Sequence, residues 1–196
     1  MSLRYFSILF IGLVLFTACN SDYVPRPRAY FKIPLPEHRY QVFNEPGYPY
    51  TFEYPVYASI VKDTTFFEDR PENPYWINID FPRFSSRIYI SYKQIGSQTF
   101  DKLRDDAYKM TYKHTLKATS IEDSLMQTQQ GITGVFFNVG GNAATGRQFF
   151  LTDTTKHFLR GALYFDTTPN EDSLSVVDHF LSEDMRHLIN SFKWKN

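Results

Sequence analysis

The chain has 196 residues, a length that fits one domain. Phe, Tyr and Trp make up 18% of it, so there is enough apolar surface for a core, and general disorder is excluded. Lys and Arg number 21, as do Asp and Glu, and this net charge of zero disfavours a nucleic-acid binder. The single cysteine excludes a disulfide framework and a Cys-rich zinc site.

The N-terminus has the pattern of an export signal. Residues 1–18 read MSLRYFSILFIGLVLFTA, with a positive charge at Arg4, an apolar run over 6–16, and the small residues Thr17 and Ala18 at the end. This order of charged, apolar and small residues is typical of a secretory signal peptide. The apolar run is shorter than the roughly 20 residues that a membrane-spanning helix needs. We predict that residues 1–18 are a signal peptide.

The sequence Phe16-Thr-Ala-Cys19 resembles the lipobox of bacterial lipoproteins, in which the cysteine becomes the first residue and carries the lipid. No other cysteine occurs, and this one stands where acylation requires it. We therefore predict that Cys19 carries acyl chains such as palmitate, which together anchor a protein stably to a membrane. The alternative is an ordinary signal peptide that is followed by an incidental cysteine.

The residues after Cys19 bear on the side of the membrane that the protein faces. Surface-exported lipoproteins of the Bacteroidota tend to carry an acidic cluster here, whereas residues 20–30 contain one acid, Asp22. We therefore predict a lipoprotein that faces the periplasm. The residue after the cysteine is Asn20 and not the Asp that retains lipoproteins in the inner membrane, so the inner leaflet of the outer membrane is favoured.

Residues 19–49 are predicted to form a lipidated, Pro-rich tether, because they contain six of the chain's 11 prolines. Proline fixes φ and removes a backbone donor, which favours an extended chain. Aromatic residues such as Tyr40 and Phe43 within this segment indicate that it packs on the domain. A single α+β domain is predicted over residues 50–196.

The first half of the predicted domain has the two-residue period of β-strands. Tyr residues and Phe alternate with other residues over 48–54, and a second extended piece follows over 56–61. The clearest hairpin joins strands at 75–81 and 87–95 through the turn sequence PRFSS at 82–86.

The second half mixes helices with strands. Apolar residues at steps of three and four predict a helix over 99–114. Strands are predicted at 132–139, 147–153 and 157–165, and a long helix begins at Glu171, before a short extended tail. These elements predict an α+β fold with a mainly antiparallel sheet and flanking helices. Their order resembles the Mog1/PsbP-type sandwich.

The glycine-rich segment GNAATGRQ at 141–148 comes close to a phosphate-binding P-loop. Arg147 and Gln148 replace the Lys and the Ser or Thr of that motif, and a strand follows where a helix is needed. A hairpin turn is the better interpretation. Because such a loop of small residues can approach another backbone closely, Asn142, Thr145 and Arg147 are candidate partner-binding residues. The alternative is structural: the glycines shape the turn, and Arg147 pairs with a nearby carboxylate.

Motifs for catalysis or for metal binding are weak. His179 and Glu183 lie one helical turn apart, but no third ligand is evident, so a solvated helix face is the better interpretation and no metal is predicted. There is no GxSxG motif to support a serine nucleophile. Carboxylate pairs leave little local signal, so an envelope hydrolase is a distant alternative. The many aromatic side chains also allow a peptidoglycan- or polysaccharide-binding lipoprotein, although core packing is the commoner role.

Three segments together resemble the gliding-motility lipoprotein GldD family of the Bacteroidota: DYVPRPRAYF at 22–31, YPYTFEYP at 48–55, and QFFLTDTTKHFLRGALYF at 148–165. The resemblance implies a non-catalytic, membrane-anchored component of gliding motility, which is coupled to the type IX secretion system. It implies other envelope proteins as partners, and neither a cofactor nor a small-molecule substrate. Of the family's functional residues, only the lipidated Cys19 carries over.

Overall fold

A computed structural model describes residues 32–63, 71–96 and 98–195. The chain divides into two units, 1–33 and Pro34–Asn196, and the second holds the strands and helices that follow. The predicted signal peptide, Cys19 and the first part of the predicted tether lie outside the described residues. Within the described ranges, no helix is long and apolar enough to cross a membrane.

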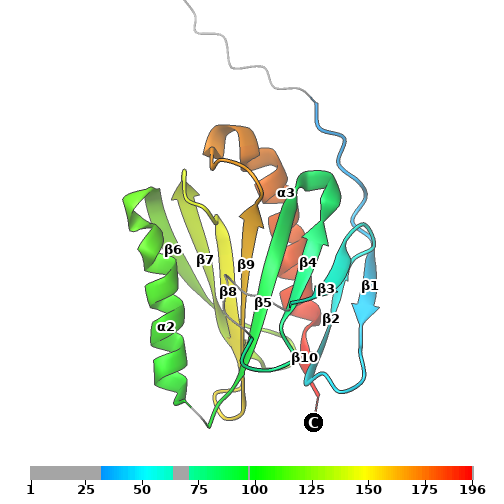
Figure 1. Ribbon diagram of the computed structural model, residues 1–196, viewed down its shortest axis with the longest axis vertical. Helices are drawn as coiled ribbons and strands as arrows, with labels where there is room; N and C mark the ends of the chain where they lie inside the picture. The colour runs from blue at the N-terminus through cyan, green and yellow to red at the C-terminus, as the bar shows by residue number, and fades with distance from the viewer. Residues whose placement is uncertain (1–31, 64–70, 97, 196) are drawn as a thin grey trace, which may run out of the picture. The chain divides into compact units, whose positions relative to one another are not determined.

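Seven of the described strands form the main sheet, in the order β3-β4-β5-β9-β8-β7-β6, and every neighbouring pair is antiparallel (Figure 1). The strands are β3 (Ser59–Lys62), β4 (Ile77–Phe81), β5 (Ser86–Gln94), β6 (Ala118–Gln127), β7 (Thr133–Gly141), β8 (Arg147–Thr152) and β9 (His157–Phe165). The predicted α+β fold with a mainly antiparallel sheet is confirmed. The edge strand β6 was not predicted from the sequence.

A second, three-stranded sheet has the order β1-β2-β10 and consists of β1 (Tyr40–Phe43), β2 (Tyr50–Pro55) and β10 (Lys193–Trp194). This sheet includes residues of the predicted tether, because β1 pairs with β2 inside a unit that begins at Pro34. The compact unit thus begins at Pro34, whereas the predicted domain begins at residue 50. The prolines at 46 and 49 belong to the connection of the β1–β2 hairpin, where Gly47 has a φ of +83°.

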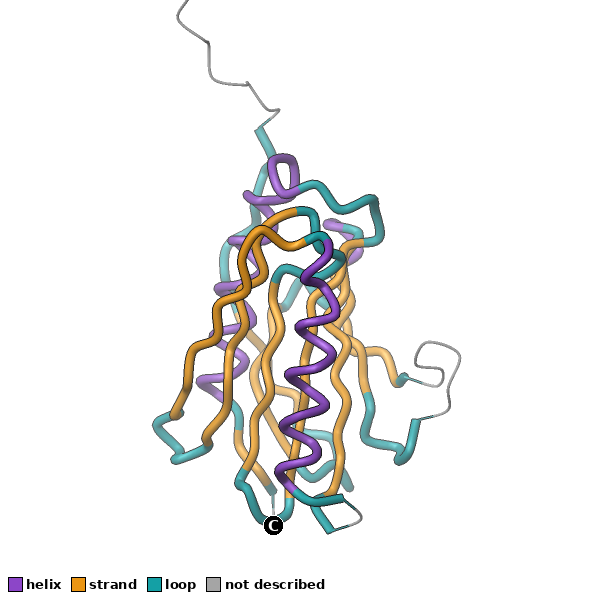
Figure 2. Tube along the Cα trace, turned by 90° about the vertical axis from the view of Figure 1, so that its left-hand side faces the viewer, coloured by secondary structure: helices purple, strands orange, loops and turns teal. Residues whose placement is uncertain are grey.

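Two of the described helices flank the main sheet: α2 (Phe100–Tyr112) and α3 (Glu171–Ser191). Thr99 caps α2, because its hydroxyl accepts a hydrogen bond from the backbone N–H of Lys102 at 3.4 Å. Asn170 caps α3 in the same way through the N–H of Ser173 at 3.2 Å. Short 3₁₀ turns occupy Pro82–Phe84 and Lys113–Leu116. In Figure 2, α2 is the long helix nearest the viewer.

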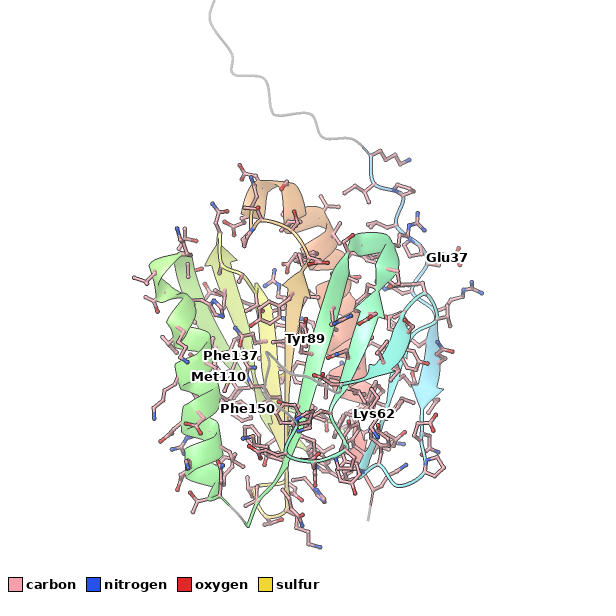
Figure 3. The ribbon with its side chains drawn as sticks, viewed as in Figure 1. Glu37, Lys62, Tyr89, Met110, Phe137 and Phe150 are labelled. Carbon is pink, nitrogen blue, oxygen red and sulfur yellow. The ribbon has the colours of Figure 1, made fainter. Side chains whose placement is uncertain are left out.

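The two helices cover opposite faces of the main sheet. Successive side chains of a strand point to opposite faces, so neighbouring residues of one strand contact different helices. In β7, Phe136 packs in the cluster that contains the α3 side chains, whereas Phe137 packs in the cluster of α2. Phe137 and Phe150 have ring centroids 6.3 Å apart and lie beside α2, as Figure 3 shows. Two separate cores therefore sandwich one sheet.

The larger core also joins the second sheet to the end of α3. Phe192 is completely buried and stacks near Tyr50 and Phe52 of β2, at centroid distances of 5.9 and 6.5 Å. Burying one such side chain contributes about 1.5–3 kcal/mol. Many of the chain's aromatic side chains are thus core side chains.

Candidate functional site

A cavity of about 360 Å³ lies between the β7–β8 turn and the N-terminal half of α3. The turn contributes residues 140–147 apart from 142 and 145, and α3 contributes residues such as Asp178 and His179. Of the three predicted partner-binding residues, Arg147 lines this cavity. Gly141 shapes the turn: its φ is +87°, and a Cβ there would lie 2.7 Å from the backbone nitrogen of Thr119.

Arg147 is held by neighbours within the chain. Its Nε donates to Oδ2 of Asp178 at 2.8 Å, its Nη2 lies 2.6 Å from the same oxygen, and its Nη1 donates to Oδ1 of Asn138. Burial raises the pKa of Asp178, and the guanidinium of Arg147 opposes that rise. The geometry thus matches the structural alternative, in which Arg147 pairs with a nearby carboxylate. A partner-binding role for Arg147 stays a prediction.

The other two predicted partner-binding residues, Asn142 and Thr145, differ from Arg147 in their contacts and from each other in their exposure. Oδ1 of Asn142 accepts a hydrogen bond from the backbone N–H of Glu171 at 2.9 Å, which ties the exposed turn to the first turn of α3. Thr145 is completely buried, and its hydroxyl donates to the carbonyl oxygen of Arg147 at 3.2 Å. Since β8 begins at Arg147, a strand follows the glycine segment, as the hairpin interpretation requires. The exposed tip of the turn consists of Asn142 and Ala144.

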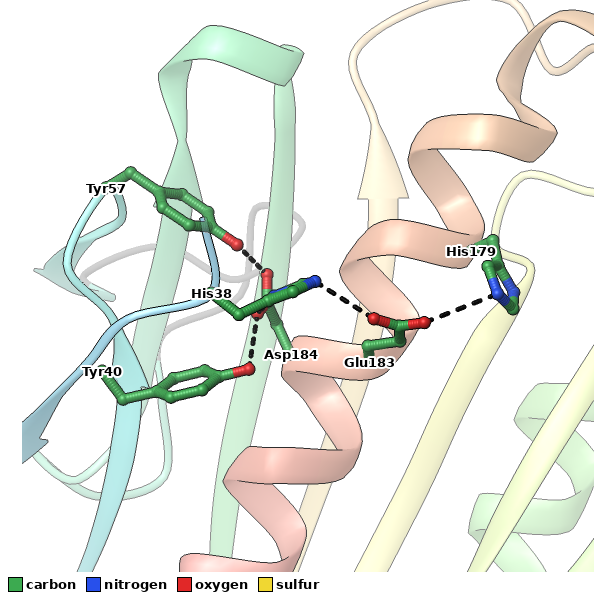
Figure 4. Close-up of polar contacts among 6 residues, drawn as sticks. All are labelled: His38, Tyr40, Tyr57, His179, Glu183 and Asp184. Atoms are coloured by element: carbon green, nitrogen blue, oxygen red, sulfur yellow. Dashed lines mark hydrogen bonds and ion pairs between the residues drawn. The ribbon is translucent and has the colours of Figure 1, made fainter. Parts of the chain in front are cut away.

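A second polar cluster, which the sequence analysis did not predict, surrounds the carboxylate of Asp184 on α3 (Figure 4). Nδ1 of His38 lies 2.7 Å from Oδ1, and the hydroxyl of Tyr40 donates to the same oxygen at 3.0 Å. The hydroxyl of Tyr57 donates to Oδ2. Asp184 is only 1% exposed, so these donors replace the water that a carboxylate otherwise binds.

Glu183 connects this cluster to the cavity at the β7–β8 turn. Its Oε2 lies 3.1 Å from Nε2 of His38, and its Oε1 lies 3.6 Å from Nε2 of His179, which lines that cavity (Figure 4). The sequence analysis found the pair of His179 and Glu183 but not His38, which is far away in sequence. In the part of the chain that the structure describes, no group of three His, Cys, Asp or Glu side chains could hold a metal ion.

The residues around Tyr40 extend the cluster towards β2. The Tyr40 ring stacks on His187 of α3 at a centroid distance of 3.5 Å, and Nε2 of His187 lies 2.7 Å from Oε2 of Glu53. Burial raises the pKa of Tyr40, and the nearby charge of Asp184 raises it further. The start of the compact unit is therefore attached to α3 through stacked rings and hydrogen bonds.

One sequence signal could have pointed to this cluster. Asp184 stands on the apolar stripe of α3, between the buried residues Leu181 and Leu188. A carboxylate on such a stripe requires hydrogen-bond donors from elsewhere in the fold. The pattern does not say which donors, because His38 lies 146 residues away.

Comparisons with known proteins bear on the whole chain. A family model described as gliding motility lipoprotein GldD matches residues 20–194. No curated protein matches the chain. Among solved structures, the chain is similar to the solution structure of cyanobacterial PsbP (CyanoP) from Synechocystis sp. PCC 6803, at 13% identity and a TM-score of 0.48, over 87% of this chain and 99% of that one. Because the family model matches from residue 20 to the last strand, the chain belongs to the gliding motility lipoprotein GldD family.

Proposed function

We propose that this gliding-motility lipoprotein is a non-catalytic accessory component of gliding and of the associated type IX secretion machinery. It is anchored by acyl chains on Cys19, faces the periplasm, and acts through contacts with other envelope proteins. The observation that carries the proposal is the family match, which begins at residue 20, directly after Cys19, and covers every described strand and helix.

The geometry of the polar side chains supports an accessory role. Arg147 and Asp178 pair with each other, and the carboxylate of Asp184 accepts hydrogen bonds from donors of the same chain. Polar groups that satisfy one another in this way stabilise a single conformation. Such an arrangement suits a protein that presents a rigid surface to a partner.

The surface that we assign to the partner is the exposed tip of the β7–β8 turn, beside the cavity. Asn142 and Ala144 are exposed there, and Ala143 lines the cavity. Their small side chains allow a partner's backbone to approach closely, and the turn is fixed to α3 by the contact of Asn142 with Glu171. A partner would therefore meet a preorganised surface.

Affinity capture from native membranes tests this assignment. We expect the tagged lipoprotein to recover gliding or secretion proteins, and Ala144→Arg to reduce that recovery while the thermal unfolding temperature stays the same. The matched control is Thr155→Arg, which places the same charge on the exposed turn at the other end of β8. Equal recovery with both variants would show that the β7–β8 turn is not the contact surface. Retention on peptidoglycan without protein partners would favour the polysaccharide-binding alternative instead.

Membrane fractionation tests the anchor. We expect Cys19→Ser to abolish acylation and to release the protein from membranes, since an acyl chain contributes about 0.8 kcal/mol for each buried CH₂. Intact cells should protect the wild-type protein from added protease, and opening the outer membrane should expose it. Membrane association that survives Cys19→Ser unchanged would contradict the lipoprotein assignment, and density-gradient separation of the two membranes would test the preference for the outer one.

A further inference from the structure

A different cavity lies on the opposite face of the main sheet, where α2 crosses β5 and β9. Its volume is about 420 Å³, within the range of small-molecule sites, which is roughly 300–1,000 Å³. Leu103, Ala107 and Met110 of α2 line one wall, and Trp76 and Phe158 contribute further apolar surface. Arg160 of β9 brings a positive charge into this largely apolar space.

The guanidinium of Arg160 has a neutral hydrogen-bond partner. Its Nη2 donates to Oε1 of Gln148, an oxygen that also accepts from the Thr111 hydroxyl at 3.1 Å. Across residues 32–63, 71–96 and 98–195, no carboxylate forms an ion pair with Arg160, although Glu72 and Asp106 line the same cavity. Burial lowers the pKa of Arg160.

Several other arginines of the helices and the sheet form ion pairs. Arg87 bonds to Asp80 at 2.5 Å, Arg147 to Asp178 at 2.6 Å, and Arg104 to Asp105 at 2.9 Å. Lys93, which also lines this cavity, lies 2.6 Å from Oε1 of Glu72. Of the four charged residues that line the cavity, Lys93 and Glu72 therefore pair with each other, whereas neither Arg160 nor Asp106 forms an ion pair among the described residues.

A partly buried guanidinium without a counter-charge loses part of its hydration, and departures of this kind concentrate at functional sites. Its planar fork of N–H donors matches the two oxygens of a carboxylate. A ligand carboxylate would give Arg160 the counter-charge that no carboxylate of the described residues supplies through an ion pair. The apolar walls require that the rest of the ligand be apolar.

We infer that this cavity binds an amphiphilic monoanion of the fatty-acid type, with its carboxylate on Arg160 and its aliphatic chain against Leu103, Met110 and Phe158. This site is separate from the β7–β8 turn, and its ligand is not the acyl group of Cys19. A lipid-like ligand is a small molecule that a protein at a membrane surface can acquire from its surroundings.

The test uses the full mature chain with Cys19→Ser, so that neither acyl chains nor detergent compete. The described core residues lie between Phe43 and Phe192, so we expect this variant to fold without the lipid. Calorimetric titration with decanoate, below the concentration at which it forms micelles, should show saturable binding at one site. Arg160→Met should weaken that binding about tenfold to a hundredfold, and Arg160→Lys should weaken it less.

Three comparisons make the result decisive. Arg104→Met, on the exposed side of α2, should leave decanoate binding unchanged. Decyltrimethylammonium, which has the same chain with the opposite charge, should bind much more weakly than decanoate. Inorganic phosphate alone should not compete, because it lacks the apolar chain. Equal decanoate affinity of the wild type and of Arg160→Met would overturn the proposal. So would wild-type affinity for decyltrimethylammonium that equals its affinity for decanoate. Competition by phosphate would also overturn it and would indicate a simple anion site instead.

The unfolding free energy separates a ligand-binding role of Arg160 from a structural one. Removing an unpaired, partly buried charge should leave Arg160→Met at least as stable as the wild type, whereas a structural role predicts a loss of stability. If Arg160→Met does not fold, Met110→Trp provides an independent test. Met110 is 44% exposed and lines the cavity, so the larger ring fills the cavity while Arg160 stays in place. Unchanged decanoate affinity in Met110→Trp would also overturn the proposal.

Discussion

Nδ1 of His38 lies 2.7 Å from Oδ1 of Asp184, and the two residues are 146 positions apart in the chain. The contact attaches the beginning of the compact unit to the middle of α3. Since Asp184 is 1% exposed, its charge depends on His38, Tyr40 and Tyr57 for hydrogen bonds. His38 and Tyr40 lie within the predicted tether, so this part of the segment packs on the fold at a buried carboxylate.

Asp184→Asn should lower the free energy of unfolding by about 2 kcal/mol, because a neutral amide accepts weaker hydrogen bonds and brings its own donors towards two hydroxyl groups. For a chain of this size the melting temperature should fall by about 5 °C. Glu183→Gln is the matched control on the neighbouring residue, whose side chain is 54% exposed, and it should change stability by less than about 0.5 kcal/mol. Equal effects of the two variants in thermal unfolding would show that burial of Asp184 does not determine its role.

The same cluster predicts a loss of stability at high pH. The pKa values of Tyr40 and Tyr57 are raised, by burial first and then by the hydrogen bonds and charge of Asp184. Each raised pKa contributes stability that is fully present below the unfolded value of about 10 and is lost as the pH rises towards the folded value. Urea unfolding at pH 8, 10 and 11 should show a steep decrease above pH 10, and Tyr57→Phe should reduce this slope. An unchanged slope in Tyr57→Phe would contradict the assignment.

Arg147→Ala should destabilise the fold by about 2 kcal/mol, because it leaves the partly buried carboxylate of Asp178 without its counter-charge. The double variant Arg147→Ala with Asp178→Ala should be less destabilised than the sum of the two single changes, since the pair acts as a unit. Arg104→Ala, which removes an exposed ion pair on α2, serves as the control and should unfold like the wild type. An Arg147→Ala variant that is as stable as the wild type would contradict the structural role of this pair.

Asp153 predicts a loss of stability in acid. Although burial acts to raise its pKa, three backbone N–H groups that donate to Oδ1, from Thr155, Lys156 and His157 at 2.8–3.0 Å, lower the pKa overall. A lowered carboxyl pKa contributes stability above the unfolded value of about 3.9, and this stability is lost as the pH falls through the folded value. Asp153→Asn should cost about 1 kcal/mol at pH 7 in urea unfolding, and the difference from the wild type should shrink at pH 3. A difference that is independent of pH would contradict this prediction.

Local patterns predicted the strongly periodic elements well. The hairpin of β4 and β5, the strands β7 to β9 and both helices lie within a few residues of their predicted positions. Each of these elements has one face buried in a core, so its apolar residues recur with the period of its own secondary structure. The family, too, was predicted correctly from short segments that lie along the chain.

β6 and β1 were missed for a common reason. β6 is the edge strand of the main sheet, and most of its side chains are exposed, so it has no alternation of apolar and polar residues to detect. β1 was predicted as tether because prolines surround it. Its pairing with β2 depends on hydrogen bonds between backbones, which any sequence can form, and on the burial of Phe43.

The sequence by itself therefore predicted an export signal and determined the periodic elements, the fold class and the family, because each of these depends on residues that are close together in the chain. Only the tertiary structure showed that Asp184 meets His38, Tyr40 and Tyr57, that Arg147 meets Asp178, and that Arg160 has no carboxylate partner among the described residues. These relationships join residues from different elements. The packing of the sheet and the helices brings these residues together. Burial determines how much each charge affects stability, and burial exists only once the elements have packed.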